Sequence, residues 1–129
     1  TEKSKRRHPT IQSAIDARFK AGDLSLDSAR LLVERNIQST DAGFEWRTDQ
    51  RLRTGSPIRV SELTAKDIIQ HIEAPTLICT AVDGYDMVRS NLERFKTDYR
   101  NMRHVEVTGG HHCHMDEAED IAQRIADFL

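Results

Sequence analysis

The chain has 129 residues, which is the size of about one domain. Charged residues make up 31% of it and hydrophobic residues 37%, a lean supply for a compact core. The net charge of -2 argues against a dedicated nucleic-acid binder, and no apolar run is long enough to span a membrane, so neither partner is expected.

Apolar periodicity predicts two helices in the first third of the chain. Apolar residues recur at helical spacing from Ile11 to Phe19, so a first helix is expected over 10–21. Ser25 is a suitable N-cap for a second helix. The apolar face of this second helix comprises Leu26, Ala29, Val33 and Ile37.

The segment 38–60 loses this periodicity, and we expect it to be irregular. It holds the only tryptophan, Trp46, close to Phe44. Two interpretations are open for these aromatic residues: they pack onto the helices, or they line a substrate cavity.

The second half of the chain alternates between strand and helix patterns. A short helix is expected to open at 64–67 with a variant capping box, and a nearly continuous apolar run predicts a buried strand over 76–82. A helix follows at about 87–99, then an alternating strand at 104–108 and a terminal amphipathic helix. This order predicts an α/β fold with two parallel strands. Two strands alone make no stable parallel sheet, so we expect the end of a larger one.

Chemically useful side chains follow both predicted strands. Asp83 and Asp86 lie in the turn after the first strand, and Gly109 and Gly110 end the second strand directly before His111. Functional groups collect at the carboxyl ends of parallel strands. A carboxylate there could hold the imidazole of His111 in one tautomer and stabilise its charged form, as in the second half of a nucleophile-acid-base triad.

The same segments resemble a known family. Ala74-Pro75-Thr76-Leu77-Ile78, the acidic turn, Gly110-His111-x-x-His114-x-Asp116 and the ending Phe128-Leu129 look like the C-terminal portion of an α/β-hydrolase-fold protein. The stretches 32–36 and 43–52 are similar to the cap of the serine hydrolase-like subgroup. The resemblance covers the chain from about Gly22 onward.

The resemblance implies a partial α/β-hydrolase fold: a cap (lid) segment over 1–60, helical and then irregular, and a C-terminal α/β core segment over 61–129. It implies that His111 is the general base and that His114 and Asp116 are supporting residues. The implied acid is Asp83, with Asp86 as the alternative; in some relatives the acid comes from an earlier strand.

The chain departs from the family at the nucleophile. The family carries a Gly-x-Ser-x-Gly elbow ahead of the cap, and this sequence has none; its only Gly-Ser pair, Gly55-Ser56, is followed by Pro57. We therefore expect the chain to be inactive alone. The parent is expected to be a serine hydrolase acting on a small-molecule ester or related acyl bond, with the missing N-terminal half as this chain's partner.

Two other interpretations compete with a hydrolase. His111, His112, Cys113 and His114 offer imidazole and thiolate donors that suit zinc, nickel or copper, although their spacing matches no standard zinc motif. A non-catalytic module is the second alternative, because a piece of a sheet exposes strand edges that favour self-association.

Cysteine usage indicates where the protein resides. Cys79 and Cys113 form no closely spaced pair, which is typical of reduced thiols in an intracellular protein. The basic stretch 1–9 contains no signal-peptide core and is expected to be a solvated linker, or the start of a chain that begins inside a larger protein. We expect a cytoplasmic protein that needs no cofactor.

Overall fold

The computed structural model describes residues 7–56 and 58–129. The chain divides into two compact units, Thr1–Pro57 and Ile58–Leu129, and each is described by itself. The first six residues of the basic N-terminal stretch and Pro57 lie outside the described residues.

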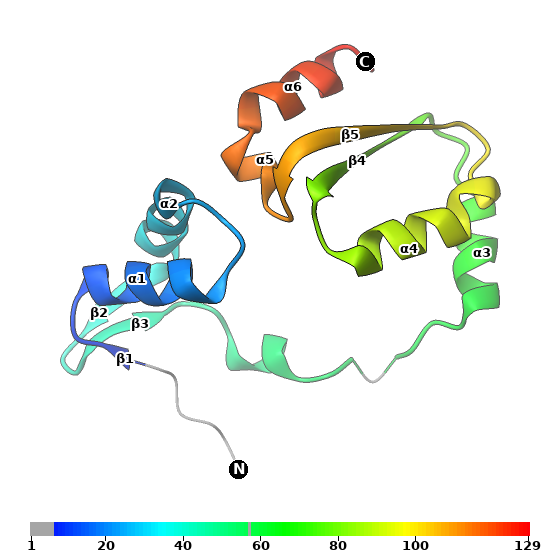
Figure 1. Ribbon diagram of the computed structural model, residues 1–129. Coiled ribbons are helices and arrows are strands. Elements are labelled where there is room, and N and C mark those ends of the chain that lie inside the picture. The colour runs from blue at the N-terminus through cyan, green and yellow to red at the C-terminus, as the bar shows by residue number, and fades with distance from the viewer. Residues whose placement is uncertain (1–6, 57) are drawn as a thin grey trace. The chain divides into compact units, whose positions relative to one another are not determined.

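Unit 1 combines two helices with a small antiparallel sheet (Figure 1). Its strands are ordered β1-β3-β2. Its elements are β1 (Arg7–His8), α1 (Ile11–Ala21), α2 (Leu26–Asn36), β2 (Ile37–Thr40), β3 (Gly43–Trp46) and the 3-10 helix η1 (Gln50–Arg53).

Both predicted helices of unit 1 are confirmed, and hydroxyl caps fix where they begin. The Ser13 backbone N–H donates to Thr10 Oγ1 at 3.1 Å, and the Ser28 backbone N–H donates to Ser25 Oγ at 3.2 Å. Each bond satisfies a backbone donor that has no partner within its helix. The helices pack through one buried cluster: Ala14, Ile15, Leu24, Ala29, Val33 and Ile37.

The prediction of an irregular segment over 38–60 is wrong for its first part. β2 and β3 form a hairpin there, and Ile37, predicted on the helix face, begins β2. Gly43 allows this hairpin, because its φ is +110° and a Cβ would lie 2.7 Å from the His8 carbonyl oxygen. Strands of four residues contain too few alternations to stand out in a sequence.

Unit 2 is a parallel strand pair with helices around it (Figure 1). β4 and β5 confirm the two predicted parallel strands. The elements are α3 (Glu62–Gln70), β4 (Thr76–Asp83), α4 (Asp86–Phe95), the 3-10 helix η2 (Lys96–Asp98), β5 (Met102–Gly110), α5 (Cys113–Asp116) and α6 (Ala118–Ala126).

One helix start in unit 2 was predicted too late. α3 begins at Glu62, because Ser61 rather than Thr64 is the cap. The Thr64 backbone N–H donates to Ser61 Oγ at 3.1 Å, so Thr64 lies inside the first turn. Ser61 and Thr64 both carry a hydroxyl group that can cap a helix, so the sequence alone is compatible with a helix start at either residue.

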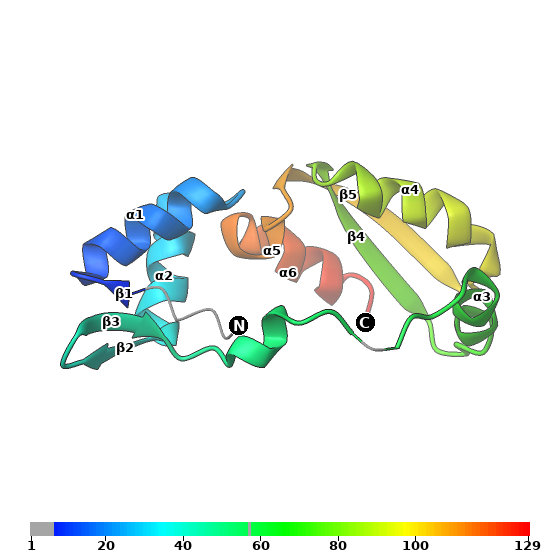
Figure 2. The same cartoon turned by 90° about the horizontal axis from the view of Figure 1, so that it is seen from below.

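The helices cover the two faces of the strand pair. α4 lies on one side of β4 and β5, and α5 and α6 lie on the other, as both views show (Figures 1 and 2). The buried set within the described part of unit 2 is small: Thr80, Val107 and Cys113. Large apolar side chains remain exposed, among them Leu63 at 80% and Met87 at 66%. Such a sheet buries little of its own surface.

No helix in the described ranges has the length and apolar character needed to cross a membrane.

Candidate active site

The carboxyl ends of β4 and β5 bring an acid and a histidine to neighbouring positions. Asp83 is the register partner of Gly110, and His111 follows Gly110 directly. The register shifts between Ala81 and Asp83, so the last residues of β4 leave the regular ladder. Asp83 and His111 thus lie at the carboxyl ends of neighbouring parallel strands, and their roles as acid and base stay predictions.

Two tight backbone positions shape these strand ends. Gly109 has φ +97°, and a Cβ there would lie 3.4 Å from Cγ of Glu117. Gly84 follows Asp83, and its N–H donates to the Ala81 carbonyl at 3.1 Å. A Cβ on Gly84 would lie 3.1 Å from that same oxygen. Both turns thus depend on glycine, which fixes where the flanking side chains leave the backbone.

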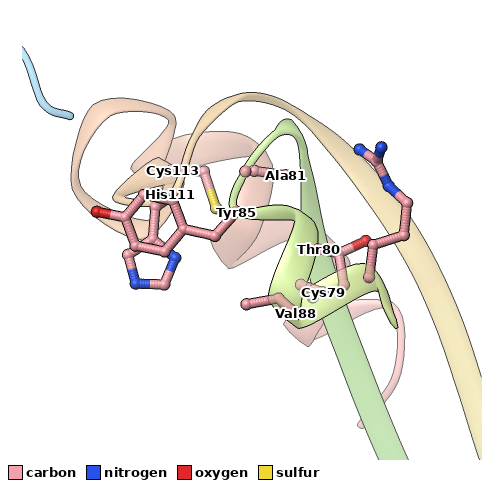
Figure 3. A pocket seen from close by; sticks show the side chains of 9 residues that line it. Cys79, Thr80, Ala81, Tyr85, Val88, His111 and Cys113 are labelled. Carbon is pink, nitrogen blue, oxygen red and sulfur yellow. The ribbon is translucent and has the colours of Figure 1, made fainter. Parts of the chain in front are cut away.

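Aromatic rings lie against His111 on two sides. The Tyr85 ring stacks on the imidazole with centroids 4.1 Å apart and an interplanar angle of 17° (Figure 3). The His112 ring meets it edge-on at 5.2 Å and 67°. His111 is exposed to solvent.

These residues border a cleft between the end of β4, the start of α4 and the turn after β5 (Figure 3). Strand β4 contributes Cys79, Thr80 and Ala81 to the lining of this cleft. The segment after β5 contributes His111 and Cys113. The remaining lining residues are Gly84, Tyr85, Val88 and Arg89. A base at the rim of a cleft is a common arrangement in enzymes.

The two thiols in the cleft do not resemble activated nucleophiles. Burial raises the pKa of the Cys79 thiol, and the neighbouring Cys113 raises it further. Cys113 is itself buried. A raised pKa keeps Cys79 protonated at neutral pH, and the reactive form of cysteine is the thiolate. Neither cysteine is therefore a good partner for His111.

The alternative acid, Asp86, is exposed, as Asp83 is, but it begins α4 whereas Asp83 ends β4. The Asp86 side chain is 98% exposed. Its carboxylate lies 4.0 Å from the guanidinium of Arg89, one turn further along the helix. An acid at the first turn of a helix also interacts favourably with the helix dipole, which gives Asp86 a structural role.

The predicted supporting residues lie together in α5. The ring of His114 is 5.9 Å from that of His112, and the Asp116 backbone N–H donates to the His112 carbonyl at 3.2 Å. These contacts link α5 to the residue beside His111, and the supporting roles of His114 and Asp116 stay predictions.

The aromatic residues predicted for the substrate pocket belong to unit 1. Phe44 and Trp46 are half-buried and pack against its core cluster. This agrees with the interpretation that the two aromatic residues pack onto the helices of unit 1. Their role in a substrate pocket stays a prediction.

The structure gives the metal interpretation no support. Across residues 7–56 and 58–129, no group of three or more His, Cys, Asp and Glu side chains is placed to hold a metal ion. The histidine rings of 111–114 interact with one another and with Tyr85 instead.

Sequence reasoning missed Tyr85, Arg89 and the two cysteines as lining residues of the cleft. One signal was available for Tyr85, because it lies in the turn that also carries Asp83, at the carboxyl end of a predicted strand. A side chain at that position is placed where active-site residues of parallel sheets gather.

No family model matches the chain. A serine hydrolase-like protein of Danio rerio is 27% identical over 112 residues, which cover 82% of this chain and 34% of that protein. The chain thus spans about a third of the length of the curated relative it matches.

Solved structures match more of the chain. A hypothetical protein of Pseudomonas aeruginosa has a TM-score of 0.83 at 29% identity, covering 98% of this chain and 44% of that one. The thioesterase domain from the curacin biosynthetic pathway has a TM-score of 0.84 at 21% identity, covering 98% of this chain and 46% of that one. The chain therefore has part of an α/β-hydrolase fold and resembles the C-terminal portion of a serine hydrolase-like protein.

Proposed function

We propose that the full-length protein hydrolyses a small-molecule ester or a related acyl bond, and that this chain supplies its general base, His111, and its acid, Asp83. The observation that carries the proposal is the register of the parallel strands, which pairs Asp83 with Gly110, the residue before His111. Histidine suits this role because its unperturbed pKa lies near neutral pH.

The mechanism needs a serine from the N-terminal half of the parent. The imidazole of His111 takes the proton of the serine hydroxyl as its oxygen attacks the acyl carbon. The resulting imidazolium then gives that proton to the departing alkoxide, which leaves as the alcohol. Water hydrolyses the acyl-enzyme in the same way, and His111 returns the proton to the serine. Asp83 stabilises the imidazolium while it exists.

Two observations support this assignment over a cysteine-based reaction. The chain is similar in sequence to a serine hydrolase-like protein and in fold to a thioesterase domain. Cys79 in the cleft has a raised pKa, because partial burial disfavours its thiolate. A catalytic cysteine would need the opposite shift.

Unit 1 is proposed to belong to the cap of the parent. Phe44 and Trp46 are proposed as substrate-pocket residues of the parent, since both are only half-buried and keep exposed surface beside their packing on unit 1. Aromatic side chains offer large apolar surfaces that suit an acyl chain.

The proposal is tested by comparing the full-length protein with the isolated chain. The full-length protein should hydrolyse a short-chain p-nitrophenyl ester, as measured by release of p-nitrophenolate. The isolated 129-residue chain should not, because it contains no nucleophile elbow. Hydrolysis by the isolated chain at the rate of the full-length protein would contradict the proposed division of the triad.

We further propose that the isolated chain self-associates. Unit 2 has exposed apolar residues such as Leu63 and Met87, and β4 pairs only with β5 among the described residues. An unpaired strand edge beside apolar surface favours pairing with another copy. Multi-angle light scattering should give at least twice the 14.8 kDa chain mass, and the full-length protein should show less association. A monomeric isolated chain would refute this.

A further inference from the structure

Tyr85 is in a position that the proposed mechanism does not yet use. Its ring is nearly parallel to that of His111, at a centroid distance of 4.1 Å. An imidazole on an exposed turn can rotate about its Cβ–Cγ bond, and only some orientations aim a ring nitrogen at a nucleophile. A flat ring against one face blocks this rotation, because turning the imidazole would drive its edge into the phenol.

The backbone around Tyr85 is held at both ends. Gly84 N–H donates to the Ala81 carbonyl at 3.1 Å, which ties the turn to β4. Val88 N–H donates to the Tyr85 carbonyl at 2.9 Å, which begins α4. The Tyr85 ring therefore extends from a fixed point between strand and helix, although Tyr85 as a residue is 48% exposed.

A second ring limits His111 from another direction. His112 meets the imidazole edge-on at 5.2 Å. The imidazole of His111 thus has the Tyr85 ring stacked on one face and the His112 ring against it edge-on. His111 is nevertheless exposed to solvent. Preorganised orientation of a base raises the rate of the chemical step, because fewer unproductive orientations are sampled.

We propose that Tyr85 is a positioning residue, which orients the imidazole of His111 for proton transfer by stacking on it. This rests on the proposed function of His111. The turn Asp83-Gly84-Tyr85 then does two tasks: it carries the acid and it carries the ring that orients the base. The phenol hydroxyl has no part in this, and only the flat ring is required.

The test uses the full-length protein with Tyr85→Leu, which removes the flat ring at similar size, and Tyr85→Phe, which keeps it. Tyr85→Leu should lower kcat for the p-nitrophenyl ester by about ten- to hundredfold with little change in KM. Tyr85→Phe should keep most of the kcat. Met87→Ala is the matched control, because Met87 is exposed on the first turn of α4 and does not line the cleft.

A spectroscopic measurement separates this inference from the proposed function. The ring protons of His111, observed with ¹³C-labelled histidine, should show an upfield ring-current shift that Tyr85→Leu removes and Tyr85→Phe retains. An unchanged shift in Tyr85→Leu overturns the inference, as does an unchanged kcat. An equal loss of kcat in both variants also overturns it, because the hydroxyl would then be the important group. If His111→Ala keeps full activity, the proposed function fails, and the ring shifts alone decide whether Tyr85 orders His111.

Discussion

Replacing His111 with alanine should abolish ester hydrolysis by the full-length protein. The expected fall in kcat is roughly 10⁴-fold or more, because a triad without its base cannot deprotonate the serine. KM should change little, since the imidazole acts on the nucleophile and the leaving group rather than on substrate binding. The measurement is steady-state kinetics with a short-chain p-nitrophenyl ester.

The chain offers a matched control for this substitution in His71. It is an exposed histidine at the end of α3, where Nδ1 lies 2.7 Å from the Asp67 carbonyl oxygen within the same helix. It lines no part of the cleft. His71→Ala should therefore keep normal kinetics. If His111→Ala retained activity comparable to His71→Ala, the assignment of His111 as the base would be wrong.

The strand and helix order of unit 2 could be predicted because its signals are local. The run 76–82 is apolar and β-prone, and Gly109 and Gly110 mark the end of the next strand. The observed strand Thr76–Asp83 extends its prediction by one residue at the C-terminal end, and Met102–Gly110 extends its prediction by two residues at each end. The parallel arrangement followed from the helix between them.

The hairpin of unit 1 could not be predicted in the same way. β2 pairs with β3 through four positions, and one of them is Thr40 opposite Gly43. Its stability depends on packing of Phe44 and Trp46 against the core of the two helices, which is a tertiary effect. Strand preference of this kind comes from the packed surface more than from the residues themselves.

In the candidate site, too, the sequence predicts which residues follow each strand but not how their side chains pack. The spacing of Asp83 and His111 relative to their strands predicted that they come to neighbouring strand ends. The stack of Tyr85 on His111 depends on the direction in which two side chains leave two turns, each of which contains a tightly placed glycine, Gly84 or Gly109. A sequence pattern contains the residues of such a stack but not its geometry.

The choice between Asp83 and Asp86 as the acid can be decided by one pair of substitutions. Asp83→Asn should lower kcat of the full-length protein by about 10²- to 10⁴-fold, because an amide in place of the carboxylate no longer stabilises the imidazolium and favours the wrong tautomer. Asp86→Asn should have little effect on kcat. The two variants are isosteric with the native residues and lie three positions apart, so each is a control for the other.

The difference in kcat expected between Asp83→Asn and Asp86→Asn follows from where the two carboxylates lie. Both residues are exposed, but Asp83 is opposite Gly110, the residue before His111, whereas the Asp86 carboxylate lies 4.0 Å from Arg89 on its own helix. Thermal unfolding should be measured alongside, because a carboxylate in a turn can also stabilise the following helix, and a loss of kcat at unchanged Tm isolates the chemical effect. A larger loss for Asp86→Asn would reverse the assignment. Full activity in both variants would mean that the acid comes from an earlier strand of the parent, and His111 would then be the only member of the triad in this chain.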